Sequence, residues 1–291
     1  MFAARRFTNT DRRHKFTIMQ NPVRLSDRAV VSVEGSDAET FLQGLITNGV
    51  GKLASGEARY SALLAPQGKV IADFLIARSD DGFLLDVAKS AADDLIKRLN
   101  MFRLRAQVAI ARRDDLCVIA FDGAPDPRDP RAPKRRIAPA AEATANEARR
   151  NYDAARIACG LSEQGRDFAA SEVFPADVNM DVLNGVDFKK GCFVGQEVVS
   201  RMKRRGTARR RTFVVRFEGA APETPCAVMA GDVDLGPLTS ALDGSGLARL
   251  RADRLAAAQA AGTAIRADGV DLKVDWPDWL PLPETEASAN D

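Results

Sequence analysis

The first half of the chain alternates between two hydrophobic patterns. Segments of 10 to 15 residues with apolar positions three to four apart predict helices. One begins at Ser36, the expected N-cap, and runs to about Leu45, and the other covers residues 91–101. The turn Pro66-Gln67-Gly68 predicts a hairpin. Apolar or alternating runs between polar clusters predict strands, which are residues 29–33, 60–64, 70–77, 83–87, 108–111 and 116–121.

The last third of the chain changes to short strands that glycine turns separate. One short helix is expected at 254–261. Short strands with glycine turns suggest a small closed barrel. The expected strands are residues 212–217, 226–229, 233–235, 244–249 and 270–274.

Residues 122–150 interrupt these patterns. They contain five prolines and seven lysines or arginines, a composition typical of an irregular connection. We interpret the segment as a solvated surface excursion that ends in a short helix near residues 151–158.

Composition narrows the class of protein. Apolar residues make up 45% of the 291 residues, which is enough for a sizeable core and excludes wholesale disorder. No apolar run approaches the roughly 20 residues of a membrane helix, so no membrane partner is expected. The 42 basic and 40 acidic residues give a net charge of +2, so the whole chain is not a polycation.

Histidine and cysteine usage excludes several chemistries. His14 is the single histidine, so a Ser-His-Asp triad and an H-E-x-x-H zinc site are ruled out. The cysteines are Cys117, Cys159, Cys192 and Cys226, without a C-x-x-C pair. We therefore expect no stably bound metal. Cys117 and Cys159 are expected in packed positions.

The strongest candidate for chemistry is the stretch Lys189-Lys190-Gly191-Cys192-Phe193-Val194-Gly195-Gln196-Glu197, followed by a helix-like run to Arg205. Cys192 lies just before a helix N-terminus and after two lysines, and both features favour the thiolate. The alternative is that Cys192 is a small buried apolar residue. The residues alone leave both interpretations open.

Residues 190–197 resemble the K-G-C-[FY]-x-G-Q-E signature of the YgfZ-type folate-binding proteins, within the superfamily of the glycine-cleavage aminomethyltransferase, or T-protein. All fixed positions match. The likeness covers most of residues 21–206 and continues more loosely to about Leu280. It is carried also by residues 25–28, 33–35, 41–48, 65–69, 156–160 and 174–175.

The resemblance implies an α+β fold with two related α/β subdomains of the aminomethyltransferase folate-binding type, at about 21–112 and 113–206. A small C-terminal β-barrel is expected at 207–282, and residues 283–291 form an acidic tail. Residues 1–20 form a basic extension. We expect a cytoplasmic protein in which these residues are either a disordered extension or precede a functional start at Met19. The mitochondrial matrix is the alternative if the extension is a presequence.

The ligand implied by the resemblance is tetrahydrofolate or a one-carbon derivative. Phe193 would stack on the pterin or, alternatively, pack in the core. Cations near the motif would attract the glutamate tail of folate, with a solvated loop as the alternative. The implied folate-binding residues are Lys189, Lys190, Phe193, Gln196, Glu197 and Arg201.

Two positions depart from the aminomethyltransferase pattern. Ala158 stands where those enzymes hold the pterin with a glutamate, and Ala72-Asp73 replaces a pair of aspartates. Asp73 is either a surviving catalytic carboxylate or a surface aspartate at a strand end. These departures weaken the expectation of glycine-cleavage activity, and whether the chain is an enzyme stays open.

The resemblance implies a tetrahydrofolate-binding protein that supports assembly or repair of iron–sulfur clusters, with the Cys192 thiolate as the reactive group. Its partners would be client or assembly proteins, because one cysteine cannot replace the four thiolates that usually hold a cluster. One alternative is a folate-dependent aminomethyl or methyl transferase. The other is a non-enzymatic module that binds RNA or an acidic protein through the basic run 201–211, for which a solvated basic face is the plainer interpretation.

Overall fold

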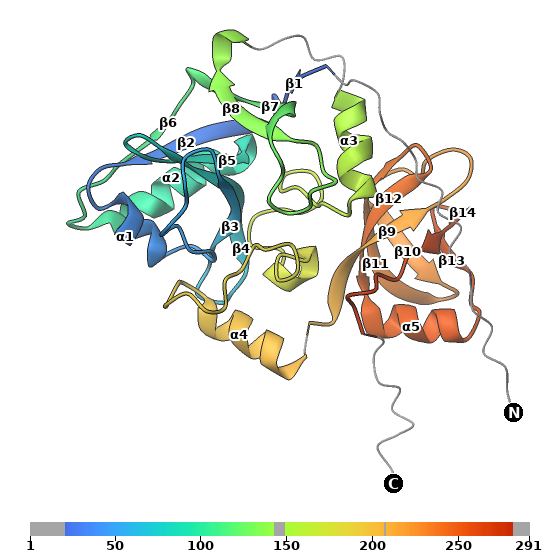
Figure 1. Cartoon of the computed structure of the whole chain (residues 1–291). Helices are drawn as coiled ribbons and strands as arrows, with labels where there is room; N and C mark the ends of the chain where they lie inside the picture. The colour runs from blue at the N-terminus through green and yellow to red at the C-terminus, as the bar shows by residue number, and fades with distance from the viewer. Residues whose placement is uncertain (1–20, 143–148, 207, 282–291) are drawn as a thin grey trace, which may run out of the picture.

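The computed structural model describes residues 21–142, 149–206 and 208–281. The basic extension with His14 and the acidic tail lie outside these residues. Figure 1 shows a first sheet and the C-terminal barrel on opposite sides of the segment that carries the short 3-10 helix η2 (Pro175–Val178). The expected α+β class is confirmed.

The first sheet has five antiparallel strands in the order β3-β4-β5-β2-β6. Both of its faces are covered. Phe74 and Ile76 face a core that the helix α2 closes with Leu95 and Leu99, while Leu75 faces a second core. The elements are β2 (Arg28–Glu34), α1 (Ala38–Gln43), β3 (Ala58–Leu64), β4 (Val70–Ser79), β5 (Gly82–Ala88), α2 (Lys89–Arg103) and β6 (Ala109–Arg112).

The expected start of the first helix is wrong. Asp37, not Ser36, is the N-cap, and its side chain makes no capping bond. Its carboxylate instead accepts the backbone N–H of Gln107 at 2.7 Å. The Asp37 side chain therefore links the start of α1 to Gln107, which lies in the loop between α2 and β6. The helix ends at Gln43.

A second, smaller sheet follows, in the order β1-β7-β8. Its strand β8 lies inside the stretch expected to be a solvated excursion, and that expectation is wrong. Asp126, Arg128 and Arg135 of this stretch are buried, because each is paired with opposite charge inside the fold. The elements are β1 (Val23–Arg24), β7 (Leu116–Ala124), β8 (Arg135–Pro139), η1 (Ala140–Glu142) and α3 (Arg149–Ala158).

The C-terminal strands form a nearly closed seven-stranded barrel in the order β14-β13-β10-β11-β12-β9-β15, as the glycine-punctuated pattern predicted. Phe213, Leu238 and Leu250 fill it, and Leu255 of α5 closes one end. The elements are β9 (Arg210–Arg216), β10 (Cys226–Ala230), β11 (Val233–Leu242), β12 (Ser245–Arg251), α5 (Ala252–Ala260), β13 (Ile265–Ala267), β14 (Val270–Asp271) and β15 (Lys273–Val274).

The helix α4 (Gln196–Arg205) follows the loop segment that carries η2 and leads into the first barrel strand, β9. It begins where the sequence predicted. Val199 is buried and Met202 half-buried on its inner side, while Lys203, Arg204 and Arg205 occupy its last turn, where cations suit the helix dipole. The glycine that follows, Gly206, ends the helix in the left-handed conformation.

Candidate functional site

Cys192 is exposed on the loop that leads into α4. Lys190, two positions before it, and Phe193, directly after it, are both buried, whereas the Cys192 side chain is not. The alternative that Cys192 is a buried apolar residue is therefore wrong. Cys117 is buried as expected, and Cys159 and Cys226 are half-buried.

Lys190 anchors the upstream side of this loop. Its Nζ donates hydrogen bonds to the carbonyl oxygens of Ile46 at 2.6 Å and Asn48 at 3.2 Å, and it lies 5.5 Å from the centroid of the Phe193 ring. Burial lowers the pKa of Lys190 to about 8. The lysine is a structural clamp, so the expectation of a solvated side chain, or of one that binds a folate tail, does not describe this conformation.

Asp187 shapes the backbone in front of the clamp. One of its carboxylate oxygens accepts the backbone N–H groups of Lys189 at 2.8 Å and Lys190 at 3.2 Å. Its own N–H donates to the carbonyl oxygen of Thr47 at 3.0 Å. The loop of Cys192 is thus bonded to the turn at residues 46–48, and this partnership has no signal in the local sequence.

Gly195 fixes the downstream side. Its φ is +78°, and an added Cβ would lie 2.6 Å from the carbonyl oxygen of Ala65 and 3.2 Å from Cα of Gly68. The helix start therefore packs directly on the β3–β4 turn, at a distance only glycine permits. Gly191 has nothing within 4 Å of such a Cβ. Of the two glycines that bracket Cys192, only Gly195 is required by close packing.

The remaining motif residues separate into buried and exposed sets. The Phe193 ring packs in a core with Tyr60, Val70 and Val199, so core packing is its role and its faces are not free for a ligand. Gln196 is half-buried. The exposed residues are Lys189, Glu197 and Arg201.

Asp73 lies in the middle of β4 and is only 3% exposed, so a surface position at a strand end is wrong. The Tyr60 hydroxyl donates to its Oδ2 at 2.8 Å, while its Oδ1 has no hydrogen-bond partner among the described residues. Burial raises the pKa of Asp73, although Arg28 opposes the shift. Ala72, its neighbour, faces the opposite core.

A buried ionic network lies at the centre of the molecule, around Glu163. Its carboxylate accepts hydrogen bonds from Arg135 and from the Tyr152 hydroxyl. Arg135 also pairs with Asp86 at 2.9 Å, and Asp86 with Arg28 at 2.6 Å. Burial alone would raise the pKa of Glu163, but the charges of the surrounding arginines, Arg135 foremost, hold it far below its ordinary value.

A short repeat in the sequence adjoins this network, since Asp126 lies 3.8 Å from Arg135. The spacing of its charged residues could have predicted two local ion pairs. Residues 126–131 read Asp-Pro-Arg-Asp-Pro-Arg. In each half the arginine pairs with the aspartate two residues before it, Arg128 with Asp126 at 2.7 Å and Arg131 with Asp129 at 2.6 Å. The proline between them holds each pair in a tight turn.

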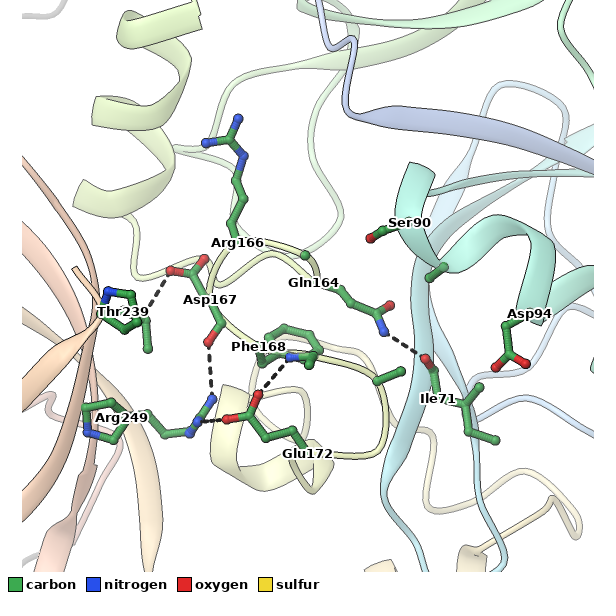
Figure 2. Close-up of a pocket in the computed structure, with 16 residues that line it drawn as sticks. Ile71, Ser90, Asp94, Gln164, Arg166, Asp167, Phe168, Glu172, Thr239 and Arg249 are labelled. Atoms are coloured by element: carbon green, nitrogen blue, oxygen red, sulfur yellow. Dashed lines mark hydrogen bonds and ion pairs between the residues drawn. The ribbon is translucent and has the colours of Figure 1, made fainter.

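A cavity of about 560 Å³ opens between α2, residues 164–172 and the barrel. In Figure 2, Gln164 reaches across to Ile71, and Arg249 lies beside Glu172. Ser90, Asp94, Arg166 and Thr239 add polar groups. Neither Cys192 nor Asp73 lines this cavity.

Within residues 21–142, 149–206 and 208–281, no group of three or more histidine, cysteine or acidic side chains is placed to hold a metal ion. Over the same ranges, none of the helices has the length and apolar character needed to cross a membrane.

Two domain families match this chain. Residues 20–128 match the GCVT N-terminal domain, and residues 209–282 match the CAF17 C-terminal β-barrel domain. In overall fold the chain resembles the glycine cleavage system aminomethyltransferase T of Bartonella henselae, with a TM-score of 0.67, 15% identity and coverage of 88% of this chain and 84% of that one.

Curated relatives include proteins named iron–sulfur cluster assembly factor IBA57, mitochondrial, or its homologs. The Mycosarcoma maydis protein is 32% identical over 240 residues, which cover 71% of this chain and 59% of that protein. The Neurospora crassa protein is 29% identical over 77% of this chain and 59% of that protein. The human protein is 28% identical over 89% of this chain and 85% of that protein. The chain thus spans 59% of the length of these fungal relatives.

The resemblance drawn from the Cys192 motif therefore holds at the level of fold and domains. The chain joins a GCVT-type N-terminal domain to a CAF17-type C-terminal barrel within the aminomethyltransferase fold, and its relatives include IBA57 cluster assembly factors.

Proposed function

We propose that this chain supports the assembly or repair of iron–sulfur clusters in other proteins, with the Cys192 thiol as the group that contacts iron or sulfur in transit. The observation that carries the proposal is an exposed cysteine between two fixed points, the Lys190 clamp and the Gly195 contact. The similarity to proteins named as IBA57 assembly factors supports the same function.

Cys192 would act together with a partner. Clusters are usually held by four thiolates, and the described residues gather no group of three potential ligands around any point. A cluster in contact with Cys192 would take its other ligands from an assembly or client protein. The chain would then serve as a temporary ligand or thiol-exchange partner rather than as a carrier.

The test is complementation of a strain that lacks the gene. Wild type and Cys226→Ala should restore the activity of a cluster-dependent dehydratase, whereas Cys192→Ala should not, at equal protein levels. Cys226 is the matched control because it is a half-buried thiol in the barrel. Full restoration by Cys192→Ala would refute the thiol role.

We further propose tetrahydrofolate as a ligand, bound in the cavity of Figure 2. Its volume of about 560 Å³ lies in the range of small-molecule sites. Asp94 and Ser90 are of the type that bonds the polar edge of a pterin. The Arg166 guanidinium, which pairs with Asp27 at 2.8 Å, would exchange that partner for the glutamate tail. The ligand would supply a one-carbon carrier, while Cys192 lies outside this cavity.

Titration of the full chain with tetrahydrofolate tests this second proposal. Ala170→Trp places a large side chain at the exposed rim of the cavity and should abolish saturable binding without changing the unfolding midpoint. Unaltered affinity in Ala170→Trp would exclude this cavity, and the absence of saturable binding to wild type would exclude the ligand.

The structure gives the aminomethyl-transfer alternative little support. Its expected catalytic carboxylate, Asp73, is buried against Tyr60 and does not line the cavity of Figure 2. A one-carbon donor bound in that cavity would not meet this carboxylate among the lining residues. Turnover with one-carbon donors that Asp73→Asn abolished would restore the alternative.

The names of the relatives, which say mitochondrial, favour the mitochondrion over the cytoplasm as the compartment of this chain. Residues 1–20 fused to a fluorescent reporter test this point. Import of the fusion into mitochondria would support the matrix, and a cytosolic reporter would support the cytoplasmic expectation.

A further inference from the structure

Cations without an ion pair among the described residues gather on α4 and on the segments just before and after it. We define the cationic surface as a set of exposed side chains that make no ion pair with any carboxylate among the described residues. Exposed arginines elsewhere are commonly paired, such as Arg131 with Asp129 and Arg150 with Asp243. The members of the cationic surface are Lys189, Arg201, Lys203, Arg204, Arg205, Arg209 and Arg210.

The geometry of α4 concentrates this charge. Arg201, Arg204 and Arg205 lie three and four residues apart, so they share one side of the helix. Glu197 is the acid one turn earlier, and it forms no ion pair with Arg201. These like charges repel one another, because no carboxylate of the described residues pairs with them. A negatively charged partner would relieve this repulsion.

A groove adjoins this surface. It has a volume of about 420 Å³ and lies between α4, η2, α5 and the end of the described chain. Its two acids are already neutralised, because Asp181 pairs with Arg211 at 2.5 Å and Asp253 with Arg251 at 2.5 Å. Its apolar lining includes Phe174, Pro175, Phe188, Val199, Met202 and Leu280.

We propose that the cationic surface and this groove dock an acidic segment of a partner protein, one that carries apolar side chains among its carboxylates. The carboxylates would face the cations of α4, and an aliphatic side chain would enter the groove beside Met202. Such a pairing gives orientation through charge and affinity through apolar burial.

This proposal rests on the proposed function, because the docked partner would be the protein brought to Cys192. Cys192 is four positions before the first residue of α4, and that stretch spans at most about 14 Å. A partner that covers the helix, itself about 15 Å long, therefore reaches the thiol.

The aromatic side chains favour a protein over RNA as the partner. Single-stranded nucleic acids bind where bases stack on free aromatic faces. Here Lys203 lies 3.7 Å from the centroid of the Phe188 ring, and Arg211 lies 5.6 Å from that of Trp279. Each cation covers one face of its ring, and the groove beside Phe188 is lined by apolar side chains that suit aliphatic groups.

The test uses three fluorescent probes on the full-length chain. One is a helical peptide of about 14 residues, built from glutamate with leucine at every third or fourth position. The second has serine in place of leucine, and the third is single-stranded RNA of about 12 nucleotides, long enough to span one such binding groove. Fluorescence anisotropy measures each affinity at low and high salt.

The leucine peptide should bind wild type at least about tenfold tighter than the serine peptide, since apolar anchors dominate such interfaces. The double variant Arg201→Glu/Arg205→Glu should weaken it by roughly tenfold or more. Arg103→Glu/Arg105→Glu is the matched control, because these arginines are also exposed and unpaired but lie at the end of α2. It should bind as wild type does.

Equal binding of the two peptides, or equal weakening by both double variants, would overturn the docking proposal. So would RNA that binds more tightly than the leucine peptide. These outcomes are separate from failure of the proposed function. Cys192→Ala should bind the peptide normally yet fail in complementation, whereas a Cys192→Ala protein that complements fully refutes the thiol role whatever the peptide does.

Discussion

The Nζ atom of Lys190 lies 2.6 Å from the carbonyl oxygen of Ile46. The two residues are 144 positions apart in the chain. This bond joins the loop that presents Cys192 to the turn after α1. The lysine of the motif is therefore a brace for the thiol rather than a charge offered to solvent.

Lys190 should make stability depend on pH. Burial lowers its pKa from an ordinary 10.5 to about 8, so between these values the unfolded chain binds more protons than the folded chain, and the free energy of unfolding rises with pH. Relative to Lys190→Met, wild type should gain about 1–2 kcal/mol from pH 8 to 10.5, after allowance for solvent screening. Urea unfolding of both proteins across this range measures it. Parallel curves would show that the amine is not desolvated.

Gly195→Ala should destabilise the chain by about 1–3 kcal/mol, because the new Cβ meets the carbonyl oxygen of Ala65 and the backbone has positive φ. Gly191→Ala is the matched control and should change the free energy of unfolding by less than about 0.5 kcal/mol. Chemical denaturation of both variants makes the comparison. Similar losses at the two glycines would contradict the close packing of α4 on the β3–β4 turn.

Cys192 should be the thiol that reacts first in the native protein. It is exposed, while Cys117 is buried. Burial raises the pKa of Cys159 to about 11 and also raises that of Cys226, so their reactive thiolates are scarce at pH 7.5. An aromatic disulfide reagent should show one fast phase that Cys192→Ala removes. A fast phase that persists in the variant would place the accessible thiol elsewhere.

Glu163→Gln should cost about 3–5 kcal/mol, because it leaves the buried arginines around it without a compensating charge. The folded-state pKa of Glu163 is far below its ordinary value of 4.5. Its stabilisation is therefore present above pH 4.5 and is lost as pH falls. Wild type should lose stability in acid more steeply than the variant.

Glu142→Gln provides the control for this experiment. Glu142 pairs with Arg136 at 3.0 Å on the surface, and loss of such a pair should change the free energy of unfolding by no more than about 1 kcal/mol. Thermal unfolding at pH 7 and pH 4 separates the two variants. Equal effects of the two substitutions would contradict the buried position of Glu163.

The patterns of the sequence predicted the elements whose causes are local. The β3–β4 hairpin, the start of α4 at Gln196 and the strands of the barrel all follow from apolar spacing and glycine turns. Cys117 was correctly expected in a core. Hydrophobic periodicity records which side of an element is covered, so these features are readable within a few residues.

Only the tertiary structure decided which charged residues are buried. Arg128 and Arg135 read as parts of a solvated, proline-rich excursion, and Asp73 as either a catalytic carboxylate or a surface aspartate, yet all three are buried. A buried charge is stable only beside an opposite charge or a hydrogen-bond partner, and these partners come from distant segments, as Glu163 does for Arg135. Sequence spacing does not record such partners.

The motif around Cys192 combines both kinds of information. Its residue types alone determined that a thiol precedes a helix, with lysines before it and a glycine after it. Only the fold decided that Phe193 and Lys190 are buried while Cys192 is exposed. The physical reason is that Lys190 bonds to the turn at residues 46–48 and Phe193 packs in a core, while Gly195 lies against the turn at residues 65–68. The thiol between them stays uncovered.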